Sequence, residues 1–180
     1  MSGRWRVQAR DQPLRGRPWL VVRGTSQTAV LTGGPVLELT ARAVSRIGPD
    51  ILDDPLDVEA IVRNLRADPR AALGEALLDQ RLVSGVGNLW RAEALWHARL
   101  SPWLPVGEAE DAELETLISE AARLLRRSLE GGAGGRQIYR RTGRPCPRCG
   151  ARIRSHGQGD DNRIAYWCPG CQRGEEYAPP

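Results

Sequence analysis

Short runs of apolar residues, separated by turn residues, occupy the first forty positions of the chain. The apolar segments are residues 19–23 and 29–32, with glycine at position 24 and a Gly-Gly-Pro turn at residues 33–35. Such segments, bounded by turn residues, are typical of β-strands. Two or three strands do not form an independently stable sheet domain, so we expect this part to need further structure around it.

A helical spacing of apolar residues begins near position 54. We predict a first helix that begins at Asp54-Pro55, where an N-cap residue precedes a proline, and that ends at Asp68-Pro69. A second apolar segment, residues 71–82, leads into a glycine-rich turn at residues 84–88. Helical spacing then resumes over residues 89–99, so two helices are expected to flank this turn.

The longest predicted helix follows Ser101-Pro102 and has one apolar face. It is expected to end at the glycine run of residues 131–135, whose composition is typical of a flexible hinge. The pattern as a whole predicts a mainly α fold with a small β part. The apolar face of the long helix consists of Leu114, Leu117, Ile118, Ala121, Leu124 and Leu125.

Size and composition limit the class of protein. A chain of 180 residues can bury one sizeable core and a small additional module. No apolar run approaches the roughly 18 residues needed to cross a bilayer, and residues 1–17 lack the apolar centre of a signal peptide. We therefore expect a cytoplasmic protein, monomeric and without a membrane partner.

The basic residues carry two kinds of information. All 26 are arginine, which excludes chemistry that requires a lysine amine, because a guanidinium group keeps its proton. Nine of them lie in residues 131–180 beside only four acidic residues, so the net charge of +4 belongs to the C-terminal part. A basic terminal module indicates a polyanionic partner, and an ordinary solvated surface is the alternative.

Two Cys-x-x-Cys pairs stand 18 residues apart in this basic part. That spacing is typical of a tetrahedral site of four thiolates, which holds one structural Zn2+. The segment between the pairs predicts a β-hairpin, with strands at residues 151–154 and 163–167 and a polar turn at residues 158–162. Disulfides and unligated thiols are the alternatives, and a reducing cytoplasm disfavours disulfides. The expected ligands are Cys146, Cys149, Cys168 and Cys171.

The glycine-rich turn between the two helices is a candidate ligand-binding loop. Gly85 and Gly87 would let backbone N–H groups approach a ligand, and Asn88 could cap the following helix. A helix N-terminus attracts phosphate. An ordinary corner between two helices, closed by a capping asparagine, is the alternative.

The other polar and aromatic candidates are expected to be structural. Glu75, Asp79 and Glu93 have arginines nearby in sequence, which favours ion pairs on helix faces over acid–base catalysis. His97 and His156 are expected to be structural or solvated, because four thiolates already complete a tetrahedral site. The six tryptophans are expected to be core aromatics in a chain without phenylalanine.

Three segments together closely resemble the formamidopyrimidine-DNA glycosylase and endonuclease VIII family. They are GEALLDQRLVSGVGNLW at residues 74–90, QIYRRTGRPC at residues 137–146 and RIAYWCPGCQ at residues 163–172. The match covers most of residues 45–173. The resemblance implies a base-excision DNA repair protein, a glycosylase and AP lyase that binds double-stranded DNA containing damaged bases or abasic sites, in a bacterial, nucleoid-associated setting.

The same resemblance implies a domain organisation. Residues 1–42 would be a remnant of an N-terminal β-sandwich domain. Residues 45–130 would form a helix-two-turns-helix DNA-binding domain, and residues 136–173 a four-cysteine zinc finger.

The resemblance also implies roles for individual residues of these motifs. Arg163 stands five residues before the third cysteine, where the family has an arginine that contacts the DNA backbone beside the lesion. Asn88 matches a phosphate-binding asparagine, in a loop with Gly85 and Gly87. Tyr139 matches a backbone-contacting tyrosine, although the arginine at position 140 replaces the usual glycine.

The chain departs from the family pattern in its first residues. Family catalysis depends on an N-terminal Pro-Glu pair, whereas Met1-Ser-Gly-Arg-Trp5 resembles a segment deep within the family's sheet domain. We therefore expect no catalytic residue in this chain and no activity of the chain alone. A non-catalytic, zinc-dependent DNA-binding or regulatory module is the alternative function, and a zinc-ribbon adaptor for proteins is a further one.

Overall fold

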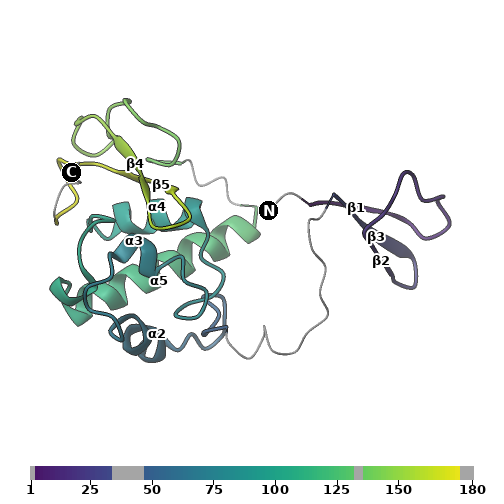
Figure 1. The fold of residues 1–180 in the computed structure, drawn as a ribbon, viewed down its shortest axis with the longest axis horizontal. Helices are drawn as coiled ribbons and strands as arrows, with labels where there is room; N and C mark the ends of the chain where they lie inside the picture. Colours follow the sequence, from purple (N-terminus) through teal and green to yellow (C-terminus); the bar gives the residue numbers. More distant parts are fainter. Residues whose placement is uncertain (1–2, 34–46, 132–135, 175–180) are drawn as a thin grey trace. The chain divides into compact units, whose positions relative to one another are not determined.

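The computed structural model describes residues 3–33, 47–131 and 136–174 of the chain (Figure 1). It consists of two compact units, residues 1–44 and 45–180. We describe each unit by itself.

The first unit contains an antiparallel sheet of three strands in the order β1-β3-β2. These strands are β1 (Arg4–Ala9), β2 (Leu20–Arg23) and β3 (Gln27–Thr32), of which β2 and β3 lie where the two apolar segments predict strands. Val30 in the central strand is buried, whereas Trp5 and Trp19 are 53% and 44% exposed. The prediction that all six tryptophans are core residues is therefore wrong for these two, because three strands alone cannot enclose an indole ring.

The second unit begins with α2 (Val58–Leu65), which is shorter than predicted. Its N-cap is Asp57, whose carboxylate accepts a hydrogen bond from the backbone N–H of Ala60 at 2.9 Å. The prediction of a start at Asp54-Pro55 is wrong, because Asp57 satisfies a free N–H group of the first turn. The helix also ends before Asp68-Pro69, with Arg66 as its C-cap.

The apolar segment of residues 71–82 forms only one short helix, α3 (Leu73–Ala76). After it the chain turns, and the Asp79 carboxylate accepts a hydrogen bond from the backbone N–H of Arg81 at 2.9 Å. An aspartate that bonds the backbone two residues later favours a turn over a helix. Spacing alone therefore overestimates the length of this helix.

Two long helices build the core of the second unit. They are α4 (Asn88–His97) and α5 (Asp111–Leu129), with a short 3-10 turn, η1 (Val106–Glu108), between them. A capping box of Glu110 and Glu113 closes the N-terminus of α5. The predicted apolar face of α5 is confirmed, except that Leu124 is only partly buried. Its buried residues are Leu114, Leu117, Ile118, Ala121, Ala122 and Leu125.

A β-hairpin of β4 (Arg154–Gln158) and β5 (Arg163–Trp167) packs against α4 (Figure 1). The predicted second strand is confirmed, but the first strand lies three to four residues later than predicted. Gln158, expected in the polar turn, is the last residue of β4 and is only 4% exposed. The cost of burying this polar side chain is offset, because its amide donates to the carbonyl of Pro102 at 2.8 Å.

Candidate metal centre and nucleic-acid interface

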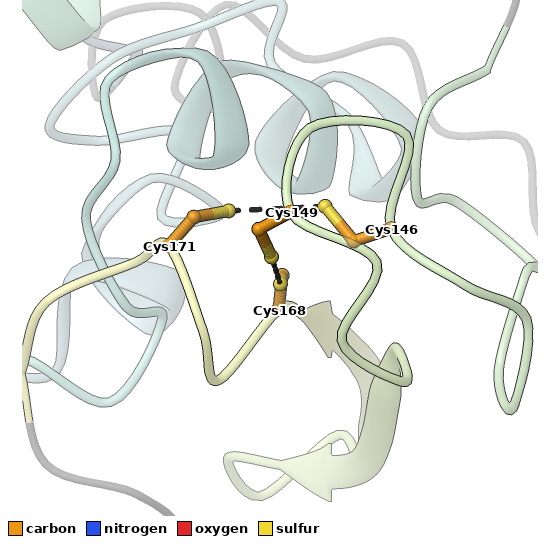
Figure 2. A group of neighbouring side chains, drawn as sticks. All are labelled: Cys146, Cys149, Cys168 and Cys171. Carbon is orange, nitrogen blue, oxygen red and sulfur yellow. Dashed lines mark hydrogen bonds between the residues drawn. The ribbon is translucent and has the colours of Figure 1, made fainter.

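The four cysteines converge from the two turns that flank the hairpin. Their sulfur atoms all lie within 4.8 Å of one another, and Figure 2 shows them pointing toward a common centre. The Cys149 and Cys168 sulfurs are 3.3 Å apart, and those of Cys146 and Cys171 are 3.8 Å apart. A tetrahedron with metal–sulfur bonds of about 2.3 Å has edges of about 3.8 Å. The cluster is thus suited to a tetrahedral metal ion, and all four cysteines are free thiols rather than disulfides.

Helix α4 contacts the thiol cluster through Trp96. The indole N–H of Trp96 donates to the sulfur of Cys146 at 3.4 Å. Burial raises the pKa of the Cys146 thiol, but this bond and two backbone N–H donors outweigh burial and lower the pKa to about 6. Arg148 lies 3.9 Å from the centroid of the Trp96 ring and 3.9 Å from the Cys171 sulfur. N–H donors and a positive charge favour the thiolate form that binds a metal, whereas burial raises the pKa of the Cys168 and Cys171 thiols.

The glycine-rich turn ends at the N-terminus of α4. Gly85 has a φ of 89°, which a side chain would disfavour, and Gly87 is the N-cap of α4. Asn88 is the first residue of the helix and does not cap it, because the extended backbone of Gly87 occupies the N-cap position. The expectation that Asn88 caps this helix is therefore wrong.

The side chain of Asn88 is directed to the hairpin instead. Its Nδ2 donates to the carbonyl of Ile164 in β5 at 3.1 Å. Its Oδ1 is buried without a hydrogen-bond partner among the described residues. A side-chain amide has two N–H donors, so one of them is left for a further acceptor.

Arg163 lies next to this contact, at the start of β5. Its side chain is 55% exposed, and its Nε lies 3.7 Å from Oδ2 of Asp161. Such an exposed pair is weak and can be exchanged for another anion. The structure thus brings Asn88 and Arg163 together through the backbone of Ile164, although they stand 75 positions apart in the sequence.

Tyr139 belongs to an aromatic and cationic group on the segment before the first cysteine pair. Its ring lies 5.2 Å from that of Tyr166, and the guanidinium groups of Arg136 and Arg140 lie 5.5 and 5.4 Å from its centroid. Arg140 has a φ of 58°. The arginine thus adopts the left-handed conformation that glycine, usual at this position in the family that the sequence resembles, adopts without strain.

The prediction that Glu93 forms an ion pair on a helix face is wrong. This residue of α4 is 3% exposed and accepts three backbone hydrogen bonds. Its carboxylate binds the N–H groups of Gln137 at 2.9 Å, Ile138 at 3.1 Å and Tyr139 at 2.9 Å. A buried carboxylate needs such partners, and here they are the entry segment of the finger.

The expectations for the other acidic residues and for the two histidines are met only in part. Asp79 forms an ion pair with Arg81 at 2.6 Å, though in a turn rather than on a helix. Glu75 forms no ion pair among the described residues, so the expectation fails for it. His97 is partly buried beside Glu120 at 3.7 Å, and burial lowers its pKa. His156 is exposed, as expected for a solvated residue.

Sequence patterns do not indicate the roles of two further residues at this interface, Arg91 and Gln158. Arg91 in α4 is 1% exposed and donates to the Gln158 side chain at 3.2 Å. The polar residues of the segment 88–97 lie on two sides of the helix and not in one stripe, and none of the ten residues is exposed. A helix without a single polar stripe is the sequence signal that could have indicated buried charges.

The fold and the site together define a class of protein: a helical domain with a glycine-rich turn, against which a basic finger with four clustered thiols is packed. A family model described as the formamidopyrimidine-DNA glycosylase H2TH domain matches residues 47–140. No helix among the described residues has the length and apolar character needed to span a membrane.

Known proteins of two bacteria are similar over nearly the whole chain. The probable endonuclease 8 2 of Streptomyces coelicolor is 41% identical over 99% of this chain and 72% of its own length. The DNA-(apurinic or apyrimidinic site) lyase Nei2 of Mycolicibacterium smegmatis is 34% identical over 96% of this chain and 72% of its own length.

A solved structure shares the fold. The formamidopyrimidine-DNA glycosylase of Lactococcus lactis, bound to DNA with an abasic site, has a TM-score of 0.74 at 23% identity, over 97% of this chain and 72% of that one. The chain belongs to the formamidopyrimidine-DNA glycosylase and endonuclease VIII family of base-excision DNA repair enzymes.

The role of Glu93 generates a stability prediction. We expect Glu93→Ala to lower the free energy of unfolding by about 3 kcal/mol, because it leaves three backbone N–H groups without an acceptor. Denaturant unfolding of the metal-loaded protein measures this value. Glu115→Ala, at an exposed position of α5, is the matched control and should change stability by less than about 0.5 kcal/mol. Equal unfolding midpoints for the two variants would contradict the anchoring role.

Proposed function

We propose that this chain binds double-stranded DNA that contains a damaged base or an abasic site, as a base-excision repair protein of the glycosylase and AP lyase family whose residues described here supply DNA binding. The observation that carries the proposal is the hydrogen bond from Asn88 to the carbonyl of Ile164, which places Asn88 beside Arg163 at the start of β5. Relatives named as endonuclease 8 and as an apurinic or apyrimidinic site lyase support the reaction class. The protein would act as a monomer and associate with the nucleoid.

The proposed domains follow the family organisation. Residues 45–130 would be the helix-two-turns-helix domain, residues 136–173 the zinc finger, and residues 1–42 part of a β-sandwich domain. The 180 residues contain no lysine, so no lysine side chain of this chain can form a Schiff base with an abasic sugar. The residues described here would bind and orient the DNA.

The proposed phosphate contacts come from two rigid elements. Arg163 extends from a strand and offers a charged fork, which pairs with phosphate and displaces counterions. Asn88 lies at a helix N-terminus, beside the backbone of Gly85 and Gly87, and offers a neutral N–H donor. Tyr139 lies on the anchored entry segment of the finger and would contact the same backbone.

The thiol cluster would hold one Zn2+ in a structural role. The four thiolates fill a tetrahedral coordination sphere and leave no position for a substrate. A bound ion would fix the two turns at the base of the hairpin, and thereby the strand that presents Arg163. The residues that hold it would be Cys146, Cys149, Cys168 and Cys171.

Metal analysis tests the zinc site. We expect one equivalent of zinc in purified, reduced protein, because four free thiols converge at tetrahedral spacing. Chelation should disorder the finger while α5 and its core stay folded, since a module of this size has little core of its own. Circular dichroism would follow the helices, and the change in total tryptophan fluorescence, to which the buried Trp167 contributes, would follow the finger. Less than half an equivalent of zinc in folded, reduced protein would exclude the site.

A salt titration separates the two phosphate contacts. We expect Arg163→Ala to weaken binding to duplex DNA with an abasic site and to lower the log–log salt slope by about 1, because one charged contact is lost. Asn88→Ala should weaken binding with little change in slope, because the lost donor is neutral.

A matched control removes a positive charge elsewhere. Arg63→Ala, at an exposed position of α2, should leave both affinity and slope near those of the parent. If Arg163→Ala and Asn88→Ala also bind like the parent across the salt range, the phosphate contacts are refuted.

A further inference from the structure

Arg91 is a buried arginine whose hydrogen bonds all go to neutral groups. Its Nη1 donates to the carbonyl of Gly74 and to Oε1 of Gln158, both at 3.2 Å. Its Nη2 donates to the carbonyls of Ile164 at 2.9 Å and Arg163 at 3.4 Å. The first two acceptors belong to the helical domain and to β4, and the last two to β5. One guanidinium group therefore joins the helical domain to both strands of the finger.

This arrangement is costly for stability. Burial and, to a smaller extent, the positive charge of Arg163 lower the pKa of Arg91 to about 10, although the negative charge of Glu75 acts in the opposite direction. Within the part of the chain that the structure describes, no carboxylate forms an ion pair with Arg91. A packed apolar side chain would avoid the desolvation of a charge, so packing alone does not explain an arginine here.

The hairpin docks closely at this point. Gln158 donates to the carbonyl of Pro102 at 2.8 Å while it accepts from Arg91. A Cβ atom on Gly74 would clash with the Gln158 side chain. The contact between the helical domain and the end of β4 thus depends on a glycine, a buried amide and the arginine, and it fixes the hairpin in one position.

The carbonyl of Ile164 connects Arg91 to the proposed phosphate contacts. It accepts from Nη2 of Arg91 at 2.9 Å and from Nδ2 of Asn88 at 3.1 Å, and a carbonyl oxygen has two lone pairs for two donors. Arg91 also binds the carbonyl of Arg163 itself. Removal of the guanidinium would leave these carbonyls without a charged donor and would loosen β5 where it begins.

We propose that Arg91 is a positioning residue for DNA binding, which holds β5 against α4 so that Arg163 and Asn88 meet the same stretch of DNA backbone. The role rests on the proposed phosphate contacts of these two residues. Arg91 acts through them, because its own guanidinium group is buried and has no free face for phosphate.

Arg91→Met in the zinc-loaded chain of 180 residues tests this role. The methionine keeps an apolar stem and removes the fork. We expect binding to abasic-site duplex DNA to weaken about tenfold, and the salt slope to fall by about 1, as in Arg163→Ala. In the Arg163→Ala background, Arg91→Met should weaken binding by less than the roughly tenfold expected in the parent, because the part of its effect that acts through Arg163 is already lost and the part that acts through Asn88 remains.

Arg91→Lys separates geometry from charge. A lysine keeps the positive charge, but its single ammonium group cannot reach the acceptors on both sides of the junction. It should therefore lose most of the affinity that Arg91→Met loses. Parent-like binding by Arg91→Lys would show that charge alone matters and would overturn the positioning role.

Arg66→Met controls for a general loss of stability. Arg66 in the helical domain donates to the carbonyls of Val106 and Ala109, both at 2.6 Å, far along the chain from the finger. Its loss should lower the melting temperature and leave DNA affinity and salt slope within about twofold of the parent. Equal loss of DNA binding in Arg66→Met would assign the effect of Arg91→Met to instability and refute the proposal.

A milder variant covers the case in which Arg91→Met does not fold. Gly74→Ala displaces Gln158 but keeps the arginine, and it should reduce affinity and slope in the same direction as Arg91→Met. Parent-like binding by folded Arg91→Met or by Gly74→Ala overturns the positioning role while the phosphate contacts stand. If Arg163→Ala and Asn88→Ala themselves bind like the parent, the phosphate contacts fail first, and the positioning role fails with them.

Discussion

The burial of α4 on every side is the constraint on which the second unit depends. Ala94 and Leu95 pack into the core with α5, and Ala92 and Trp96 pack into a second cluster with residues of the finger. No residue of the helix is exposed. Because residues of α4 belong to both cores, a shift of α4 would disturb the packing of both.

The polar residues of α4 are the means by which a small finger acquires a fixed position. A module of some 38 residues buries too little apolar surface to be stable alone. Arg91 binds the hairpin, Glu93 binds the entry segment, and Trp96 donates to Cys146. At the far end, Gln172 donates to the carbonyl of Leu100 at 2.7 Å, and Arg173 forms an ion pair with Glu113. The finger is thus held at its start, middle and end.

Local signals in the sequence were sufficient where chemistry depends on neighbours along the chain. The spacing of the cysteines predicted their convergence, and helical periodicity predicted the buried face of α5. The family motifs indicated Asn88 and Arg163, and in the structure Asn88 donates to the carbonyl of Ile164, the residue next to Arg163. Each of these features is encoded within a few residues, so a pattern can reveal it.

The sequence could not reveal contacts between segments that lie far apart along the chain. Glu93 binds residues 44 to 46 positions away, and Arg91 binds Gln158 across 67 positions. A charged residue in a helix is expected at the surface unless its partners are known, so both were assigned to the wrong surroundings or passed over. The exposed Trp5 shows the converse, because whether an apolar residue is buried depends on how many layers surround its sheet.

Arg91 and Arg163 carry positive charges close to each other. Their repulsion connects the stability of this unit with the proposed binding of DNA. Their repulsion contributes to the lowered pKa of Arg91, so the folded protein holds two like charges close together at a cost. The exposed Asp161 offsets little of that cost, because its contact with Arg163 is open to solvent. A DNA phosphate at Arg163 would place a negative charge beside both arginines and reduce the repulsion. Binding and the docking of the finger would then stabilise each other, because a ligand that binds only the assembled state favours that state.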